Sequence, residues 1–571
     1  FQAYQQIAQG DEFAALEQAQ RTAIEHALRD FRLAGVALPA QQKTRYGELK
    51  SRLSELGSQF SENVLDATNA WSKELSEEAL AGLPETALAS AREAARQAGV
   101  KGCLITLNFP SYQPVLTYCD VASLREEVYK ANCTRASREG PHAGQWDNTP
   151  IIEEIMTLRL ELAKLLGFNN YAELSLATKM AETTDEVVAF LSQLAERSQQ
   201  QAGQEWQELA QFAREHFQKE TLESWDIAYY SEKLRQHKYR ISQEEIRPYL
   251  PVHRVLAGLF EVVQRLYGVA VREVTSFDSY HEDARLFEVL QDDEVFARFY
   301  LDLYARAHKR GGAWMDDCRV RRWREGALQI PVAYLVCNFT PPVGDKPSLL
   351  TEQELTTLFH EFGHGLHHML TRQTVASVSG INGVAWDAVE LPSQFLENWC
   401  WEKDALAFIS GHHETGEPLP ATLLERMLAA RNFQSAMMMM RQIEFSLFDF
   451  RLHREWGTDS VTSVQGLLDE VRAAVAVHIP PDYNRFQNGF SHIFGGGYAA
   501  VYYSYKWAEV LSADAFSRFE EEGIFNRATG AEFRKCILEC GGSQPPMEAF
   551  VAFRGRKPDI EPLLRHSGIA A

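Results

Sequence analysis

Two histidines and a glutamate occupy the spacing H-E-x-x-H at His360, Glu361 and His364. In a helix, histidines four residues apart lie on one face, about 6 Å apart along the axis, so both imidazoles can bind one metal ion. The glutamate beside the first histidine can reach a water at that metal and act as a general base. The pattern is typical of zinc peptidases, but chance alone would place it in roughly one such chain in thirty. The surrounding sequence therefore has to support this interpretation.

The segment around the motif has the features of one uninterrupted helix. Thr351 and Glu354 fit a capping box, T-x-x-E, directly before apolar residues that recur at spacings of three and four. No proline interrupts residues 351–370. Gly363 and Gly365 each weaken such a helix by up to about 1 kcal/mol relative to alanine. That cost indicates either close packing beside the metal or glycines that the helix merely tolerates.

A catalytic zinc ion usually has three protein ligands and one open position. A metzincin would carry glycine at position 367 and histidine at position 370, and His367 and Leu370 therefore exclude that class. The alternative is a carboxylate from a later helix, and the candidates are Asp387, Glu390 and Glu397. His367 lies one turn beyond the motif, and we expect it to pack in the core or behind the ligands.

Each candidate carboxylate also has an ordinary structural interpretation. Asp387 and Glu390 are three residues apart and could form a capping box, and Glu397 could be a surface charge. However, Glu390, Gln394 and Glu397 share one helical face in apolar, aromatic surroundings, where a carboxylate needs a partner. We therefore predict that Glu390 is the third ligand. Glu397 is either an acceptor that orients a zinc-bound histidine or one half of a structural ion pair.

A second cluster consists of three glycines followed by four tyrosines. The glycines at 495–497 predict a flexible loop that can approach a substrate backbone closely. Tyr498, Tyr502 and Tyr505 recur at spacings of four and three, on one face of a predicted helix. Water attack on a peptide carbonyl creates an oxyanion, and one phenol donor aimed at it contributes about 2.7–4 kcal/mol. The alternative is a tyrosine stripe that packs in a core.

Composition indicates a large globular protein. Its 571 residues exceed one ordinary core and predict two lobes or one elongated multi-helix body. The net charge of −21 argues against nucleic acid, and we interpret it as a source of solubility. Eight cysteines without a C-x-x-C pair predict buried free thiols in a reducing cytosol. We find no apolar run of membrane-spanning length and no signal peptide. Because Phe1 begins inside helical sequence, an N-terminal segment is expected to be missing.

Periodicity predicts helices over most of the chain, with two β-rich regions. The predicted helices cover much of 1–100 (with 41–75 as one of them), 123–217, 252–267 and the chain from 351 onward. The predicted strands are 104–107, 115–118, a hairpin of 285–290 with 295–300, and 331–339. The last strand precedes the metal helix, and it is either an edge along which a peptide substrate pairs or an ordinary sheet strand.

Together these segments resemble the thimet oligopeptidase family of zinc metallopeptidases. The resemblance runs along the whole chain and is carried by residues 300–304, 309–313, 360–368, 389–394, 397–399 and 492–507. It implies that one Zn²⁺ ion is bound by His360, His364 and Glu390, and that the general base is Glu361. It also implies that the oxyanion is supported by Tyr498 and Tyr505, and that the substrate is contacted by His492, Gly496, Gly497 and Tyr502.

The family resemblance implies a mainly α-helical, two-lobed fold around a deep central channel, with a small β-sheet near the active site. We expect a helical lobe over 1–150 and a catalytic region over 151–571. The implied protein is a monomeric cytoplasmic endopeptidase for short unstructured peptides, with no nucleic-acid or membrane partner. A dipeptidyl carboxypeptidase on the same scaffold, or a peptide-binding protein without turnover, stays open. Gly495 and Val501 depart from the family pattern, and we expect them to loosen and stiffen their segment, respectively.

Overall fold

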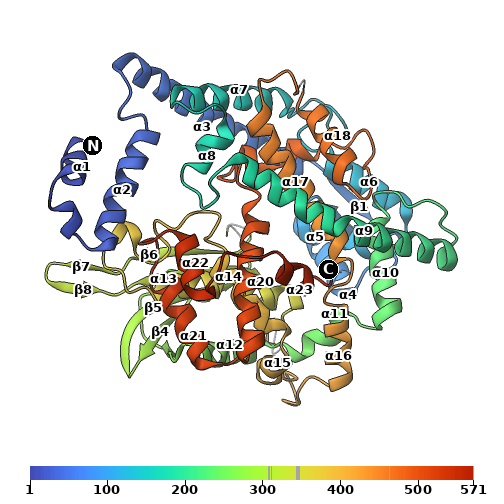
Figure 1. The fold of residues 1–571 in the computed structure, drawn as a ribbon. Coiled ribbons are helices and arrows are strands. Elements are labelled where there is room, and N and C mark those ends of the chain that lie inside the picture. The colour runs from blue at the N-terminus through green and yellow to red at the C-terminus, as the bar shows by residue number, and fades with distance from the viewer. Residues whose placement is uncertain (307–308, 310–311, 343–346, 462, 570–571) are drawn as a thin grey trace.

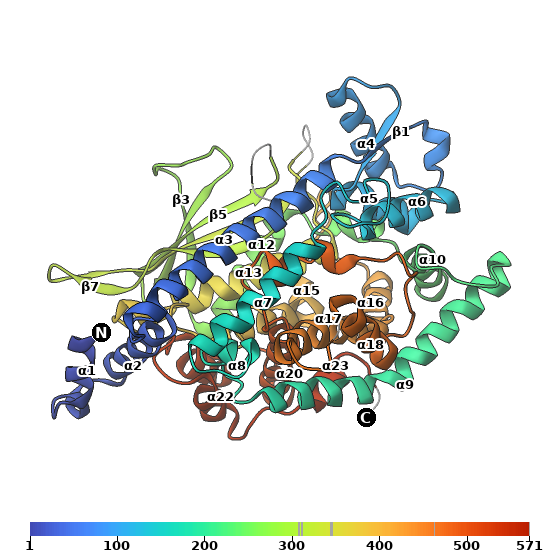
Figure 2. The ribbon, with the colours of Figure 1, turned by 90° about the horizontal axis from the view of Figure 1, so that it is seen from above.

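The computed structural model describes the chain except residues 307–308, 310–311, 343–346, 462 and 570–571. Helices make up most of the described residues and accompany a five-stranded mixed sheet and two antiparallel strand pairs, which confirms the predicted mainly α-helical class (Figure 1). Figure 2 shows the helices α3 and α7 running side by side, and the two are in contact. The lobe boundary near residue 150 and the central channel stay predictions.

The helices of the first half precede the sheet. They are α1 (Gln2–Gln9), α2 (Gln18–Leu33), α3 (Ala40–Asn69), α4 (Glu85–Ala98), α5 (Phe109–Tyr118), α6 (Ala122–Cys133), α7 (Thr149–Leu165), α8 (Tyr171–Leu176), α9 (Thr184–Phe217), α10 (Ile227–Tyr239), α11 (Gln243–Ile246) and α12 (Val252–Tyr267). Those after the sheet are α13 (Glu352–Met369), α14 (Leu391–Glu397), α15 (Lys403–Ile409), α16 (Ala421–Ala430), α17 (Ser435–Glu455), α18 (Val464–Val475), α19 (Ser491–Phe494), α20 (Ser504–Glu522), α21 (Arg527–Phe533), α22 (Pro546–Arg554) and α23 (Glu561–His566).

The N-terminal region contains long helices, as predicted, but two of its predicted elements are wrong. The helix predicted over 41–75 ends at Asn69, and β1 (Ser72–Leu75) pairs antiparallel with β2 (Cys103–Thr106). The strand predicted at 115–118 is instead the second half of α5. One proline lies in the first turn of α5, where no backbone N–H is needed, so it starts the helix rather than preventing it.

The main sheet has five strands in the order β3-β4-β5-β9-β6. Their bounds are β3 (Ala270–Val274), β4 (Arg285–Gln291), β5 (Glu294–Tyr304), β6 (Trp314–Arg319) and β9 (Val332–Phe339), and a separate small hairpin joins β7 (Arg322–Arg324) to β8 (Ala327–Gln329). The predicted β4–β5 hairpin is confirmed. Its acidic turn consists of Asp292 and Asp293 with φ of 51° and 64°, the left-handed geometry that two-residue hairpin turns require.

Strand β9 forms as predicted, but most of its length offers no edge to a peptide. Over residues 332–336 it pairs in parallel with β5 on one side and antiparallel with β6 on the other, so both backbone edges of this stretch are occupied. Substrate pairing along residues 332–336 is therefore excluded, and the ordinary-strand alternative holds for this stretch. Buried side chains of β9, including Leu335 and Cys337, share a core with the apolar face of α13. The sheet thus supports the helix that carries the H-E-x-x-H motif.

Two hydrophobic cores meet at the glycine and tyrosine segment. The larger core packs the sheet with α12, α13, α14 and α20 and includes Phe299 and Phe362. The smaller core packs α3, α7, α17 and α18 and includes Phe60 and Phe448. Tyr498 packs against both cores. A side chain at this junction touches elements that lie far apart in the sequence.

All eight cysteines are free thiols, as predicted, and five of them are buried. Among the described residues, no helix combines the length and the hydropathy that a bilayer crossing requires.

Candidate metal centre and active site

Helix α13 begins at the predicted capping box. The hydroxyl of Thr351 accepts a hydrogen bond from the backbone N–H of Glu354 at 3.1 Å, and the Glu354 carboxylate accepts one from the Thr351 N–H at 2.8 Å. This cap fixes where the helix starts and hence which face it turns toward α14. The rings of His360 and His364 lie on that face, with centroids 4.9 Å apart.

Gly363 allows α13 to approach α14 closely. A Cβ atom at this position would lie 2.5 Å from the carbonyl oxygen of Pro392 and 2.6 Å from the Cα of Ser393. Gly365 faces β9, where a Cβ would lie 3.0 Å from a methyl group of Leu335. The close-packing interpretation of these glycines is confirmed. The approach also places Glu390, the residue directly before α14, beside the two histidines.

Gly363→Ala should therefore lower the free energy of unfolding by about 1–3 kcal/mol, because the added methyl group displaces α14. The matched control is Gly203→Ala in α9, where a Cβ would meet nothing within 4 Å. That change should raise the free energy of unfolding by about 0.5–1 kcal/mol, since alanine is the better helix former. Urea denaturation of both variants measures the difference, and a gain of stability in both would contradict the packing.

One carboxylate oxygen joins the two histidines. Oε2 of Glu390 lies 3.2 Å from Nε2 of His360 and 3.1 Å from Nε2 of His364. The hydroxyl of Ser393 donates to the same oxygen at 2.9 Å. The ligand atoms of the two histidines and of Glu390 all lie within 4.8 Å of one another. Two imidazoles and one carboxylate at this spacing are a ligand set that suits a catalytic zinc ion.

The electrostatics of this cluster favour a cation. Burial opposes protonation of His360, yet its hydrogen bonds to Glu390 and Glu397 prevail and raise its pKa to about 10. Burial works in the opposite sense on Glu390, and its bonds to His360 and His364 hold the pKa of that carboxyl well below its usual range. The anionic carboxylate therefore stabilises positive charge at the point where a metal ion would sit, so these residues fit a bound divalent metal.

Glu361 lies beside the cluster with one unused oxygen. The side chain is buried, and Oε2 has no hydrogen-bond partner in the described part of the chain. Burial raises the pKa of this carboxyl. A buried carboxylate with a free acceptor is costly unless a ligand or water uses it, so this oxygen is available to take a proton from a water.

Glu397 contacts His360 at the ring nitrogen that faces away from Glu390. Its Oε1 lies 2.6 Å from Nδ1 of His360, which leaves Nε2 of that ring to face Glu390. Such an acceptor fixes the tautomer and the orientation of a metal-binding imidazole. Of the two interpretations of Glu397 offered by the sequence, this geometry favours the orienting one.

Glu397→Gln should weaken metal binding by about 10–100-fold, because an amide holds the His360 ring less firmly than a carboxylate. Competition with a calibrated chelator measures the change. The matched control is the exposed Glu417→Gln, which should leave metal affinity unchanged. Equal affinities in the two variants would show that Glu397 only forms a structural ion pair.

Asp387 does not join the metal cluster. It is fully buried and accepts hydrogen bonds from the backbone N–H groups of Met180 and Ala181, at 2.7 and 3.0 Å, and from the Tyr503 hydroxyl at 2.8 Å. The predicted capping box of Asp387 with Glu390 is also wrong, because α14 begins at residue 391 and Glu390 occupies its N-cap position. Asp387 instead connects residues 180–181, which precede α9, to Tyr503.

His367 is a core residue, as one of its two interpretations predicted. It is buried, and neither ring nitrogen has a hydrogen-bond partner among the described residues. Burial, with the like charges of His364 and His368, lowers its pKa to about 3, so the ring is neutral.

The tyrosines converge, although not as a helical stripe. Residues 498–503 form turns and α20 begins at Ser504, so the predicted helical face is wrong. Nevertheless, the rings of Tyr498 and Tyr505 stack with centroids 5.2 Å apart and an interplanar angle of 9°. The Tyr502 ring meets the Tyr505 ring edge-on at 5.2 Å, and its hydroxyl donates to Gln442 at 3.2 Å.

Asp449 explains this arrangement, and sequence reasoning missed it. Its carboxylate is fully buried in α17 and accepts hydrogen bonds from three consecutive backbone N–H groups, those of Ala500, Val501 and Tyr502, at 2.9–3.0 Å. These bonds hold the turn that brings Tyr498 back toward α20. A signal existed, since Asp449 stands between Phe448 and Phe450, where an acid needs a dedicated partner.

The tyrosine hydroxyls stay protonated beside the metal cluster. Burial raises the pKa of both Tyr498 and Tyr505. The pKa of Tyr505 is raised further by the charge of Tyr498 and by the hydrogen bond between the two phenols. The charge of the Glu390 carboxylate adds to both shifts. A neutral phenol next to a metal centre can donate a hydrogen bond to an oxyanion.

His492 and the glycines complete this segment. The His492 ring lies 5.7 Å from the ring of Tyr498 and 5.7 Å from that of Tyr502, and burial lowers its pKa. At Gly495, a Cβ would lie 2.3 Å from the hydroxyl oxygen of Ser61 in α3. This glycine therefore permits a close contact with α3.

Comparisons with known proteins agree with this geometry and with the resemblance drawn from the sequence. A model described as Peptidase family M3 matches residues 115–569. Oligopeptidase A of Salmonella typhimurium is 57% identical over 572 residues, which cover 100% of this chain and 84% of that protein. Dipeptidyl carboxypeptidase of the same organism is 34% identical over 544 residues, which cover 94% and 79%. A solved structure of PZ peptidase A with inhibitor 2 matches with a TM-score of 0.58 at 15% identity, covers 99% of this chain and 82% of that one, and supports the fold alone. The chain belongs to peptidase family M3 and is a metallopeptidase.

Proposed function

We propose that the protein is a zinc-dependent endopeptidase that hydrolyses short unstructured peptides. The observation that carries this proposal is the cluster of His360, His364 and Glu390, whose ligand atoms lie within 4.8 Å of one another beside the unused oxygen of Glu361. A relative that is 57% identical along the whole chain is named oligopeptidase A, which supports the same substrate class.

His360, His364 and Glu390 would hold one zinc ion per chain. When bound, the ion supplies a Lewis acid that polarises the scissile carbonyl and lowers the pKa of a water. Glu397 keeps the His360 ring in the orientation that presents Nε2 to the site. The Ser393 hydroxyl holds Glu390 through the same carboxylate oxygen that faces both histidines.

Glu361 is the proton carrier of the proposed reaction. Its free Oε2 takes a proton from the attacking water and then passes it to the leaving amine. Because burial raises its pKa, the carboxyl can hold the proton between the two transfers. The proton therefore never has to reach bulk solvent.

The tyrosine segment serves the oxyanion and the substrate. Tyr505 and Tyr498 donate hydrogen bonds to the oxygen that becomes negative when water attacks the carbonyl. The His492 ring packs against the rings of Tyr498 and Tyr502. His492 and Tyr502 contact the bound peptide together with the backbone at Gly496 and Gly497. Asp449 holds the turn at 500–502, which lies between Tyr498 and Tyr505.

The remaining proposals concern the environment of the protein. Eight free thiols fit a reducing cytoplasm, where disulfides are rare. The net charge of −21 disfavours a nucleic-acid partner. We propose a monomer that binds only its peptide substrates and no membrane, and sedimentation of the metal-loaded protein measures its mass.

Product analysis tests the proposed function. A soluble unstructured peptide of about fifteen residues, acetylated and amidated at its ends, is incubated with the metal-loaded protein and analysed by mass spectrometry. We expect internal cuts, which stop in a chelator and return when zinc is restored. A dipeptidyl carboxypeptidase would leave this peptide intact but release dipeptides from its counterpart with a free carboxylate. A binding protein without turnover would cleave neither peptide.

A further inference from the structure

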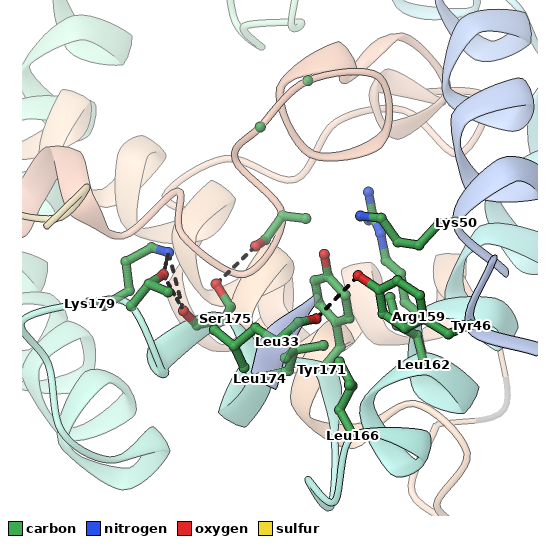
Figure 3. A pocket seen from close by; sticks show the side chains of 14 residues that line it. Leu33, Tyr46, Lys50, Arg159, Leu162, Leu166, Tyr171, Leu174, Ser175 and Lys179 are labelled. Carbon is green, nitrogen blue, oxygen red and sulfur yellow. Dashed lines mark hydrogen bonds between the residues drawn. The ribbon is translucent and has the colours of Figure 1, made fainter. Parts of the chain in front are cut away.

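A cavity of about 290 Å³ lies behind the glycine loop and includes no metal ligand among its walls (Figure 3). The helices α3, α7 and α8 form most of it, and Gly496, Gly497 and Ala499 close it from the loop. The hydroxyl of Ser175 in α8 donates to the carbonyl oxygens of Ala499 and Ala500, at 3.3 and 3.4 Å. The cavity and the segment that carries Tyr498 therefore share a wall.

Among the residues that the structure describes, three cations line this cavity and no carboxylate does. They are Lys50 of α3, Arg159 of α7 and Lys179 beyond α8, and Figure 3 shows Lys179 on the opposite side from the other two. Within the described part of the chain, none of the three forms an ion pair with an acid. Asp387 acts on Lys179 and Asp449 acts on Arg159 through their charge, but both carboxylates bind backbone N–H groups.

Arg159 is the strongest member of the group. Its side chain is only 7% exposed, and its Nη1 donates to Nε2 of His453 at 2.8 Å. His453 can accept there because its Nδ1 proton is held by Asp449, whose backbone oxygen lies 2.8 Å away. The Asp449 Oδ1 atom also lies 3.0 Å from Nδ1 of His453, so Asp449 orients Arg159 through this histidine and does not pair with it. A buried guanidinium without a carboxylate partner is costly unless a ligand supplies one.

Lys179, like Arg159, forms hydrogen bonds to uncharged protein atoms and not to a carboxylate. Its ammonium group donates to the carbonyl oxygen of Ser175 at 3.1 Å and to the Thr178 hydroxyl at 2.9 Å, so one of its three protons is unused. Burial lowers the pKa of both Lys179 and Arg159. Asp387 offsets this only in part for Lys179, and Tyr171, whose ring centroid lies 5.4 Å from the guanidinium carbon, and Asp449 do so for Arg159. An anion in the cavity would satisfy both groups.

The walls also define what the anion is attached to. Leucines at 33, 162, 166 and 174 line the rest of the cavity. A volume of about 290 Å³ is near the lower limit for small-molecule sites, so one residue fits and an extended peptide does not. Three cations repel the ammonium group of a free amino acid. The geometry points to a site for the C-terminal residue of a peptide, with its carboxylate on Arg159, Lys179 and Lys50 and an apolar side chain on the leucines.

That the carboxylate belongs to a peptide rests on the proposed function, whereas the binding itself needs no turnover. Isothermal titration of the metal-loaded protein therefore uses N-acetyl-leucine as the probe, with N-acetyl-leucinamide, leucine and inorganic phosphate as comparisons. The acid should bind at least about tenfold more tightly than the amide, because a charge-assisted hydrogen bond is lost with the carboxylate. Leucine and phosphate should bind as weakly as the amide.

Variants locate the site. Lys179→Met and Lys50→Met should each weaken binding of N-acetyl-leucine about tenfold or more, and Arg159→Gln should abolish it. The matched control is Lys164→Met, an exposed lysine of α7 outside the cavity, which should leave binding unchanged. If Arg159→Gln fails to fold, the two lysine variants still decide.

Three results would overturn the assignment: equal affinity for the acid and the amide, equal losses in Lys164→Met and Lys179→Met, or phosphate that binds as tightly as N-acetyl-leucine. Binding that is unchanged in Glu361→Gln, which should lack turnover, supports a site independent of catalysis. A wild-type protein that cleaves no peptide yet binds the acid through Lys179 contradicts only the proposed function.

Discussion

Glu361→Gln is expected to lower kcat for peptide cleavage by about 10²–10⁴-fold, because glutamine cannot carry the proton from water to the leaving amine. The substitution keeps the shape of a buried side chain that has one unpartnered oxygen, so the fold should persist. Metal content should also persist, since the candidate ligands are His360, His364 and Glu390. Steady-state kinetics on a quenched peptide, with metal analysis of the same sample, measures both quantities.

The matched control for this variant lies on the same helix. Glu354→Gln changes the same residue type at the start of α13, where glutamine also completes a capping box. It should leave kcat within about twofold of the wild type, as expected for a conservative surface change of a few tenths of a kcal/mol. Cleavage that survives in Glu361→Gln with metal bound would mean that another group carries the proton.

Tyr505→Phe is expected to lower kcat by about 10²–10³-fold, the loss typical of one oxyanion donor. The ring should stay in place, because its stacking on Tyr498 does not depend on the hydroxyl. Its elevated pKa means that the phenol donates over the whole working pH range, so the loss should not vary with pH. KM should change little, since the oxyanion exists only after water attacks.

Two comparisons make this result specific. Tyr239→Phe removes a phenol of α10 that belongs to neither the metal cluster nor the tyrosine segment, and it should leave kcat unchanged. Thermal unfolding of both variants excludes a loss of fold as the cause. A Tyr505→Phe enzyme with wild-type kcat would assign the oxyanion to other donors and leave the tyrosines a packing role.

The candidate metal ligands could be proposed from the sequence because the features that point to them lie close together along the chain. The spacing of His360 and His364 is a property of one helix, and the capping box at Thr351 marks where that helix begins. Glu390 followed from the need for a third ligand in an apolar setting. The choice among three acids could be argued because each has a distinct local environment, and the structure places Asp387 in a hydrogen-bond network of its own.

The tyrosines show where local reasoning fails. Spacings of four and three predict a helical face, yet the chain turns at 498–503 because Asp449, about fifty residues earlier, accepts three of its N–H groups. The role of β9 as an edge for a peptide could not be judged for a related reason. Its position between β5 and β6 depends on the strand order of the whole sheet. The cationic cavity joins α3, α7, α8 and the glycine loop, and no spacing rule connects segments so far apart.

The central claim is that His360, His364 and Glu390 hold the metal on which peptide cleavage depends. Zinc titration of the metal-free protein, with bound metal and cleavage rate measured on the same samples, tests it most directly. The rate should rise in proportion to occupancy and level off at one zinc per chain, while Glu390→Gln should bind zinc at least about tenfold more weakly. Full cleavage activity in the metal-free protein, or wild-type zinc affinity in Glu390→Gln, would contradict the account.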